Sequence, residues 1–362
     1  MKERIKRIFR HLEKPVDIIV IANGVEPHID RTFFYSTGIQ AGLFEGCVAL
    51  LRPDGGCHIL SSKLEADIAR AYGSPVEVFS TREEWKAALR KLLSGCRSIG
   101  VNGKEITYSS FTEVQSACPE AALLDVSEAI IGARQVKDQA EIESIRRACE
   151  IAVSAFEELL PYIETGRSEA EIAAELVYLM QSKGASGPSF PPIIASGPNS
   201  ALPHYSTGER RLQEGDFLLM DFGALYKGYV SDITRTLVLG RADKKQRRVY
   251  EVVLQAQQAA LDAMRPRVGG QEVYEVARDI IDATEFRGRF THGLGHTIGL
   301  AVHDGAAMRA SEGFVLQEGV AITVEPGVYL PGYGGVRIED DVMVTSKGVE
   351  VLTPATKELL EI

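Results

Sequence analysis

Two pairs of β-rich segments, each joined by a turn and each carrying acidic residues, constrain this chain more than any other feature of its sequence. The first pair, within 218–236, has the pattern of an antiparallel hairpin. With a turn centred on Tyr226 and Lys227, Asp221 and Asp232 are expected to lie opposite each other. Cross-strand neighbours of this kind hold their Cβ atoms roughly 5 Å apart. Two carboxylates at that distance repel strongly unless a cation or a proton lies between them.

A second ribbon repeats the arrangement near the end of the chain. Its strands lie within 321–339, and its Gly/Pro-rich turn is centred near Gly332, which sets Glu325 opposite Glu339. Four acids on two hairpins, with a nearby histidine, would form an oxygen-rich cage for two divalent metal ions. The ions of such hydrolytic pairs are about 3.5–4 Å apart, a spacing that bridging carboxylates can span. The ribbons therefore predict a dinuclear metal site.

Histidines gather in the same half of the chain. Four of the seven lie there, all in stretches rich in glycine, proline or aromatic residues, and the other three stand alone. An imidazole beside carboxylates suits Mn, Co or Zn better than Ca. Histidines that do not bind metal could donate hydrogen bonds to a polarised carbonyl. The four candidates are His204, His292, His296 and His303.

Length, charge and cysteine content bound the class of protein. A chain of 362 residues is too long for one ordinary core, so two domains are expected. A net charge of −10 without a basic run argues against a nucleic-acid partner. No segment reaches the ~18 apolar residues of a membrane span, and the run at 16–21 is too short for a secretory signal. The five cysteines, an odd number without a Cys-x-x-Cys pair, are expected to be buried thiols in a reducing cytoplasm.

Residues 1–130 have the pattern of an α/β domain, without a cluster of acids, histidines or glycines that would indicate chemistry. A strand, a hairpin, two helices and two further strands are predicted from alternation, turn residues and a capping box. These elements fall at 16–21, 47–60, 63–72, from Thr81-x-x-Glu84 onward, 98–101 and 122–126.

Residues 131–362 are predicted to form a second domain built from a repeated order of elements. Asp138-x-x-Glu141 and Ser168-x-x-Glu171 are capping boxes that open a long and a shorter helix before a β-rich stretch. A long helix at about 243–264 and a shorter helix after it precede the second β-rich stretch. Two such units in tandem predict a pseudo-symmetric domain with the acidic cage at its centre.

Five motifs in this half, taken together, resemble the pita-bread metallopeptidases, a family that includes methionine aminopeptidase, prolidase and aminopeptidase P. The resemblance covers the whole second domain, and the first domain resembles the creatinase-type N-terminal domain of the prolidase and aminopeptidase P branch. It implies an α+β chain, in which a pita-bread fold with pseudo-two-fold symmetry follows an α/β domain. The motifs are Asp221-Phe-Gly with Ser231-Asp232-Ile-Thr, His292-Gly-Leu-Gly-His296, Val302-His303-Asp304, Val324-Glu325-Pro-Gly and Val336-Arg337-Ile-Glu339-Asp340.

The resemblance also implies roles for the acids and for one histidine. Asp221 would bind the first metal ion, Asp232 and Glu339 would bridge both ions, and His296 and Glu325 would complete the second. A hydroxide shared by the two ions, which are Mn, Co or Zn, would be the nucleophile. The implied activity is hydrolysis of Xaa-Pro bonds from the N-terminus of a proline-containing dipeptide or longer peptide. Enzymes with this layout are usually homodimers.

Other residues match the positions that handle the substrate. Glu325 would carry a proton from the nucleophile to the leaving nitrogen, and Arg337 would face the substrate and hold Glu339 in place. An apolar slot would grip the proline ring. Three histidines would orient the scissile carbonyl and stabilise its oxyanion: His204, His292 and His303. Candidates for the slot are Phe190, Tyr205 and Tyr329.

The chain departs from the family pattern after His303. Family members commonly have Glu next, then a proline, and prolidases often add an arginine directly after it. Here Asp304 follows, Ala306 and Ala307 occupy the later positions, and the nearest arginine is Arg309. Dipeptidase and aminopeptidase therefore both stay open. A metal-independent creatinase-type amidinohydrolase and a non-catalytic pita-bread binding module are alternatives, but such proteins lose metal ligands, and this chain retains all five.

Overall fold

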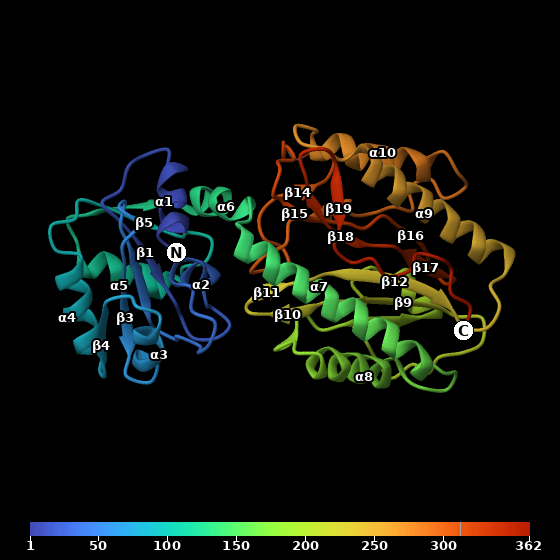
Figure 1. Cartoon of the computed structure of the whole chain (residues 1–362), viewed down its shortest axis with the longest axis horizontal. Coiled ribbons are helices and arrows are strands. Elements are labelled where there is room, and N and C mark those ends of the chain that lie inside the picture. Colours follow the sequence, from blue (N-terminus) through green and yellow to red (C-terminus); the bar gives the residue numbers. More distant parts are fainter. Residues whose placement is uncertain (312) are drawn as a thin grey trace. The chain divides into compact units, whose positions relative to one another are not determined.

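The computed structural model describes residues 1–311 and 313–362. The chain divides into two compact units, Met1–Arg134 and Gln135–Ile362. The first unit contains a mixed six-stranded sheet in the order β4-β3-β2-β1-β5-β6 (Figure 1). Its strands are β1 (Ile18–Ala22), β2 (Val48–Leu51), β3 (Cys57–Ser62), β4 (Val76–Phe79), β5 (Ser98–Val101) and β6 (Ala122–Asp125). The predicted hairpin is confirmed, because β2 and β3 pair antiparallel with Leu51 opposite Cys57.

The helices of the first unit were only partly predicted. The helix expected at 63–72 is shorter, and the one after Thr81 is capped by that hydroxyl, although Glu84 accepts from Ser80 N–H rather than completing the capping box. Trp85 and Leu89 of this helix pack into the core on one face of the sheet. The helices are α1 (Lys2–Arg10), α2 (Arg31–Thr37), α3 (Ala66–Ala71), α4 (Arg82–Leu92), α5 (Tyr108–Ala117) and α6 (Ser127–Gln135).

The prediction that all five cysteines are buried is wrong for three of them. Cys47 and Cys149 are buried, whereas Cys57, Cys96 and Cys118 are half-buried, and all five are free thiols. Cys57 is the first residue of β3, Cys96 lies just before β5, and Cys118 follows α5, so all three lie at the ends of elements.

The second unit repeats one order of elements, as predicted. Both expected capping boxes form, at the start of α7 (Gln139–Leu159) and of α8 (Glu169–Ser182). These helices pack against the sheet β12-β9-β8 through one apolar core. The strands of this half are β7 (Gly187–Pro188), β8 (Ile193–Ser196), β9 (Phe217–Phe222), β10 (Ala224–Tyr226), β11 (Tyr229–Val230) and β12 (Ile233–Val238), with short 3₁₀ turns at Leu160–Tyr162 and Gly197–Ala201.

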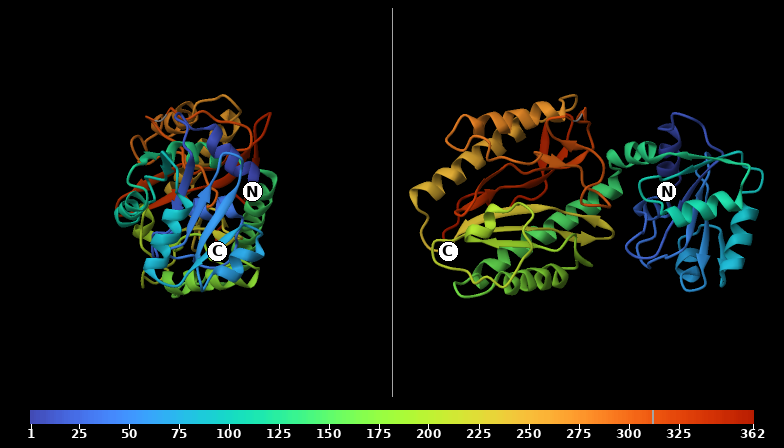
Figure 2. Two further views of the ribbon diagram at one scale, coloured as in Figure 1. Left: turned by 90° about the vertical axis from the view of Figure 1, so that its left-hand side faces the viewer. Right: turned by 180° about the vertical axis from the view of Figure 1, so that it is seen from behind.

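The second half is built in the same way. Helix α9 (Lys244–Ala263), which Asp243 and Gln246 cap, and helix α10 (Gly270–Asp282) pack on the second set of strands through another core. In Figures 1 and 2 the two helix pairs lie on opposite outer sides of the unit, with the strands between them. Those strands are β13 (Gly295–His296), β14 (Ala307–Met308), β15 (Ala321–Val324), β16 (Gly327–Leu330), β17 (Gly334–Arg337), β18 (Asp340–Val344) and β19 (Val349–Val351).

The first ribbon has a different register from the one predicted. Asp221 lies opposite Thr234, not opposite Asp232. The reason is the turn, which consists of Lys227 and Gly228 and is closed by the pair Tyr226 and Tyr229. Both turn residues have positive φ, 49° and 82°. A two-residue turn of this kind matches the twist of the strands, and relative to a turn centred on 226–227 it moves each cross-strand partner by two residues.

The register of the second ribbon is confirmed. Gly327 pairs with Arg337 in the inner ladder, and Val324 pairs with Asp340 in the outer ladder. Both ladders share one register, in which Glu325 falls opposite Glu339 at the point where the pairing is interrupted. Because the pairing is interrupted there, the side chains of Glu325 and Glu339 do not belong to one continuous face of a sheet.

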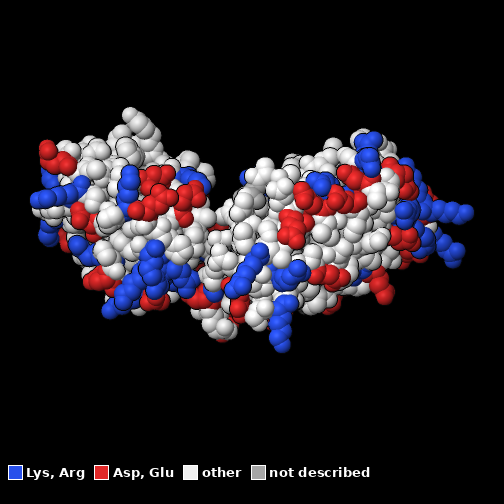
Figure 3. Space-filling view, turned by 90° about the horizontal axis from the view of Figure 1, so that it is seen from above, with Lys and Arg blue, Asp and Glu red and all other residues white. Residues whose placement is uncertain are grey.

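The molecular surface carries both acidic and basic side chains, as the composition of the chain implies (Figure 3). On the face drawn in Figure 3, acidic and basic side chains are interspersed rather than gathered by sign. Among the helices formed by the described residues, none combines the length and the apolar character that crossing a bilayer requires.

Candidate active site

All nine residues predicted to act in catalysis, metal binding or substrate binding line one cleft of the second unit. The cleft has a volume of about 540 Å³. Apolar and small residues form the rest of its wall, including Phe190, Ile193, Pro203 and Val302. The nine predicted residues are His204, Asp221, Asp232, His292, His296, His303, Glu325, Arg337 and Glu339.

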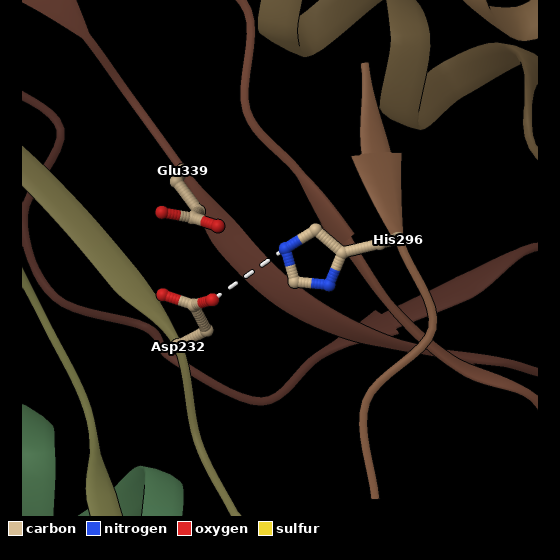
Figure 4. A group of neighbouring side chains, drawn as sticks. All are labelled: Asp232, His296 and Glu339. Carbon is tan, nitrogen blue, oxygen red and sulfur yellow. Dashed lines mark ion pairs between the residues drawn. The ribbon is translucent and has the colours of Figure 1, made fainter. Parts of the chain in front are cut away.

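The centre of the cleft is a cluster of two acids and one imidazole. One potential ligand atom from each of Asp232, His296 and Glu339 lies within 4.8 Å of the others. In Figure 4 the two carboxylates lie side by side, and the His296 ring points at them from another strand. His296 Nε2 is 3.6 Å from Asp232 Oδ2 and 3.5 Å from Glu325 Oε1. Four of the five predicted ligands thus meet around one imidazole nitrogen.

Backbone hydrogen bonds from the two ribbons fix these side chains. The Asp232 N–H donates to Asp341 Oδ2 at 2.7 Å, and the Glu339 N–H donates to the carbonyl of Thr234 at 3.1 Å. Thr234 of β12, two residues after Asp232, also donates its hydroxyl to Glu339 Oε2 at 2.6 Å. The Thr234 hydroxyl was expected on this side of the strand. The contact with Asp341 was not expected, because Asp341 follows Glu339 and Asp340 in the sequence and looks like an ordinary strand residue.

Arg337 contacts a different acid from the one predicted. Its guanidinium pairs with Asp221, and it also donates to Thr234 Oγ1 at 3.0 Å and to Tyr329 Oη at 2.8 Å. Glu339 takes its hydrogen bond from Thr234 instead. Arg337 therefore acts on Glu339 through its charge and through the shared Thr234 hydroxyl, and its guanidinium reaches across to Asp221 on β9. The second oxygen of Asp221, Oδ1, is buried and has no hydrogen-bond partner among the residues that the structure describes.

The acids destabilise one another's charged forms. Burial, followed by the charges of Glu339 and Asp221, raises the pKa of Asp232 well above its ordinary value. Burial and the charge of Glu325 raise the pKa of Glu339 in the same way. Burial raises the pKa of Glu325 to about 7, although Arg337 acts against this shift. Buried carboxylates that repel each other this strongly are stabilised by protons or by cations.

The histidines at the centre favour their neutral form. Burial, reinforced by the neighbouring His303, lowers the pKa of His296 to about 3. Burial and the charge of Arg337 lower the pKa of His292 to about 4. A neutral imidazole is the form that can bind a metal ion.

The His292 ring is hydrogen-bonded within the protein at both of its nitrogens. Its Nδ1 lies 2.8 Å from the carbonyl of Gly293, and its Nε2 lies 2.8 Å from the Tyr329 hydroxyl. Because a carbonyl only accepts, Nδ1 carries the proton and Nε2 accepts from Tyr329. Tyr329 in turn accepts from Arg337. Both ring nitrogens are engaged, so a hydrogen bond from His292 to a substrate requires breaking one of these contacts.

His204 and His303 form the open rim of the cleft. Both side chains are exposed, and the His303 ring lies 4.1 Å from the His296 ring, measured between centroids. Of the three aromatic residues considered for the proline slot, only Phe190 lines the cleft. The hydroxyls of Tyr205 and Tyr329 bond to Glu169 and His292 instead. Ile193, Pro203 and Val302, which the sequence did not single out, share the wall with Phe190.

Comparison with known proteins gives a consistent result along the chain. Residues 4–136 match the creatinase/prolidase N-terminal domain, and residues 143–346 match metallopeptidase family M24. A protein of Pyrococcus horikoshii named Xaa-Pro dipeptidase is 36% identical over 99% of both chains. The solved structure of an Xaa-Pro dipeptidase from Bacillus anthracis has a TM-score of 0.91 at 33% identity and covers 100% of this chain and 99% of its own.

A second solved structure carries a different name at nearly the same similarity. The X-Pro aminopeptidase from Thermotoga maritima has a TM-score of 0.91 at 31% identity, with 99% of this chain and 100% of its own covered. The predicted combination of a creatinase-type N-terminal domain and a pita-bread domain is thereby confirmed. The chain belongs to metallopeptidase family M24, in the two-domain form that carries a creatinase/prolidase N-terminal domain.

Proposed function

We propose that this chain is an exopeptidase that hydrolyses the Xaa-Pro bond at the N-terminus of a peptide with the help of two divalent cations. The observation that carries the proposal is the convergence of four acids and one imidazole in a single cleft, with mutually raised carboxyl pKa values. Relatives that match this chain over nearly its full length are named for the same bond.

The residues present fit a pair of cations. Asp221, Asp232, His296, Glu325 and Glu339 would hold them, with Asp232 and Glu339 as the bridging carboxylates. Asp221 Oδ1 is a buried acceptor without a hydrogen-bond partner among the described residues, and the set combines hard oxygens with one imidazole. This donor set suits Mn, Co or Zn. Bound cations would supply the chemistry of an activated water, whose pKa they lower towards neutrality.

The side chains of the protein then perform the proton and positioning steps. Glu325 would take a proton from the attacking water and return it to the nitrogen of the leaving proline. Its pKa of about 7 without a cation indicates that it can both accept and donate near neutral pH. His204 and His303, at the exposed rim, would donate hydrogen bonds to the scissile carbonyl and to the oxyanion that forms from it.

The wall of the cleft supports the preference for proline. The nitrogen of an Xaa-Pro bond belongs to the proline ring and carries no hydrogen. An enzyme that requires an N–H donor at this nitrogen therefore cannot hydrolyse the bond. Phe190, Ile193, Pro203 and Val302 instead offer apolar surface to the pyrrolidine ring. The length of the accepted peptide depends on the segment after His303. Ala307 and Arg309 both line the cleft there, so a substrate carboxylate that reaches this end of the cleft would come close to the Arg309 guanidinium.

Metal reconstitution tests this function. Protein treated with a chelator is titrated with Mn²⁺, Co²⁺ or Zn²⁺ while hydrolysis of Ala-Pro and of Ala-Pro-Ala is followed. We expect no activity without metal and saturation near two ions per chain. Full activity after chelation would instead support the creatinase-type hydrolase, and inactivity with every metal would support the binding module. The ratio of the two substrates distinguishes dipeptidase from aminopeptidase.

Two further properties complete the proposal. The five free cysteines support a reducing compartment such as the cytoplasm, and fractionation of the source cells tests this. The homodimer implied by the family resemblance is tested by sedimentation analysis of the purified chain.

A further inference from the structure

A fully buried acid behind the rim of the cleft gathers the segment that carries His204. This acid is Glu169, the first residue of α8, and its exposed fraction is 0%. It is not one of the predicted site residues, and it does not line the cleft. We infer that Glu169, acting through the Tyr205 hydroxyl, is the positioning residue that holds His204 at the rim. The inference rests on the role proposed above for His204.

Five donors from the segment 196–208 converge on this one carboxylate. Glu169 Oε1 accepts from the Ser196 N–H at 2.8 Å, from the Ser196 hydroxyl at 2.7 Å and from Asn199 Nδ2 at 3.0 Å. Its other oxygen accepts from the Tyr205 hydroxyl at 2.8 Å and from the Gly208 N–H at 3.3 Å. A buried carboxylate needs such donors to remain stable, and here one short stretch of chain supplies all of them.

The two ends of this segment have other anchors, but its middle depends on Glu169. The Thr207 hydroxyl accepts from the Ile194 N–H and donates to the carbonyl of Pro192, which ties the returning end to β8. Ser200 is tied to Gly335. The Tyr205 ring packs against the cluster of Ala195, Leu219 and Tyr329, and its N–H donates to the Leu202 carbonyl at 3.1 Å. Among the described residues, the polar contacts of its hydroxyl are with Glu169 and with Asn199, from which it accepts at 2.9 Å. Removing this hydroxyl would therefore leave the Tyr205 side chain held by apolar packing alone and loosen the stretch around 205.

His204 lies directly beside Tyr205 and has no hydrogen bond of its own among the described residues. Its ring is exposed at the rim, so the backbone that carries it determines where it points. Because consecutive Cα atoms are about 3.8 Å apart, a displacement of Tyr205 is passed to His204 almost undiminished. The carboxylate is thus connected to the rim by one hydrogen bond and one peptide bond.

A carboxylate suits this position better than an amide. All five contacts of Glu169 are donors that point towards it, so the NH₂ group of a glutamine would face a donor on one side. Arg210 also stabilises the Glu169 carboxylate indirectly. It donates at 2.6 Å to the Ser196 hydroxyl, which donates to Glu169, and it pairs with Asp216 at the same time. Glu169→Gln is therefore expected to loosen the segment while changing almost no volume.

A double-mutant cycle separates positioning of His204 from general support of the fold. Tyr205→Phe, His204→Ala and the double variant are compared with the parent by kcat/KM on Ala-Pro. If Tyr205 acts through His204, Tyr205→Phe lowers kcat/KM about tenfold in the parent and less than twofold in the His204→Ala background. An equal loss in both backgrounds, or no loss in the parent, would overturn the inference. Glu169→Gln is expected to behave like Tyr205→Phe.

Matched controls come from the same helix. Glu171→Gln keeps the capping box with Ser168, because glutamine serves there as well as glutamate. Tyr178→Phe removes a hydroxyl from a side chain that is 65% exposed. Both controls should retain the kcat/KM of the parent, which shows that loss of a carboxylate or a hydroxyl on α8 is not itself harmful.

A measurement without catalysis keeps the inference distinct from the proposed function. The imidazole signal of His204 in the NMR spectrum of the full-length protein is identified by its absence in His204→Ala. We expect this signal to shift in Tyr205→Phe and in Glu169→Gln and to stay in place in both controls. A chain without peptidase activity would refute the proposed function while the spectrum still decides the inference. An unchanged His204 signal in both variants would refute the inference alone.

Discussion

The acidic cage (Asp221, Asp232, His296, Glu325 and Glu339) and the histidine rim (His204 and His303) lie in the same cleft, yet they are built in opposite ways. Asp232 and Glu339 are 4% and 2% exposed, and their backbone N–H groups donate to the Asp341 carboxylate and to the carbonyl of Thr234. His204 and His303 are exposed and lie on connecting segments. The cage is therefore rigid and electrostatically strained, whereas the position of the rim depends on a few side-chain contacts behind it.

This difference separates two parts of the function. Ligands on strands, or directly beside strand ends, hold a fixed geometry, as metal binding requires. Segments outside regular structure vary more easily, and they are where substrate preference is usually set. In this chain the departures from the family pattern, at Asp304, Ala306 and Ala307, follow His303 of the rim and do not fall on the cage; Ala307 lines the cleft, whereas Asp304 is buried and pairs with Lys137. Variants on the two sides should accordingly fail in different ways.

The largest effect is expected from breaking the cage. Asp232→Asn and Glu339→Gln keep the volume of each side chain but remove a bridging charge, so each should lower kcat by about 1,000-fold or more. Metal analysis should find fewer than two ions per chain, and the circular dichroism spectrum should be unchanged. Near-normal turnover in either variant would contradict the bridging roles.

Removing the metal should make stability depend on pH in a specific direction. The pKa of Glu325 rises from 4.5 to about 7 in the folded chain without a cation, and those of Asp232 and Glu339 also rise. Groups with raised pKa values bind protons more tightly when folded, so they stabilise the fold at low pH, and this contribution is lost as pH rises through about 7. The Tm of protein whose metal has been removed with a chelator should fall by roughly 5 °C between pH 5 and pH 8.

The metal-bound protein provides the comparison for this experiment. Added Mn²⁺ or Zn²⁺ should raise Tm more at pH 8 than at pH 5, since protons and cations compete for the same oxygens. The double variant Asp232→Asn with Glu339→Gln should show a flatter pH dependence without metal. A metal-induced rise in Tm that is larger at pH 5 would show that the cage is not the metal site.

Breaking the rim should have a smaller effect and leave the cage filled. His303→Ala removes one donor from the position proposed for the oxyanion and should lower kcat by about 100-fold. Metal content should stay at the value of the parent, which elemental analysis measures on the same sample. Loss of one ion in this variant would place His303 among the ligands and erase the distinction between the two regions.

The sequence predicted the cage better than the rim for physical reasons. Alternation along a strand decides which residues share a face, so acids on two ribbons could be grouped without knowing the fold. The exact pairing of Asp221 depended on one turn residue, because Lys227 adopts a positive φ that nothing in its type demands. The partner of Arg337 depended on contacts between ribbons, and local spacing carries no information about these.

The networks behind the rim were beyond any local pattern. Glu169 was not singled out from the sequence, and its five donors come from a segment that begins 27 positions later in the chain. Tyr205 and Tyr329 were candidates for the proline slot because they are aromatic, but their hydroxyls bond to Glu169 and His292 instead. Side chains with one polar group and a large apolar ring fit both interpretations until the neighbours are known.

The smallest effect is expected at the mouth of the cleft. Arg309 is exposed, so its attraction for a substrate carboxylate is screened by water and salt. Arg309→Gln should lower the ratio of kcat/KM for Ala-Pro to that for Ala-Pro-Ala about threefold at low ionic strength, because the carboxylate of the dipeptide lies nearer the reacting bond. The difference should largely disappear in 0.5 M salt, where the Debye length is about 4 Å. Arg90→Gln, an exposed charge on α4, serves as the control. An unchanged ratio at low salt would assign no role in peptide length to the only exposed arginine that lines the cleft among the described residues, and preference would then rest on its apolar wall.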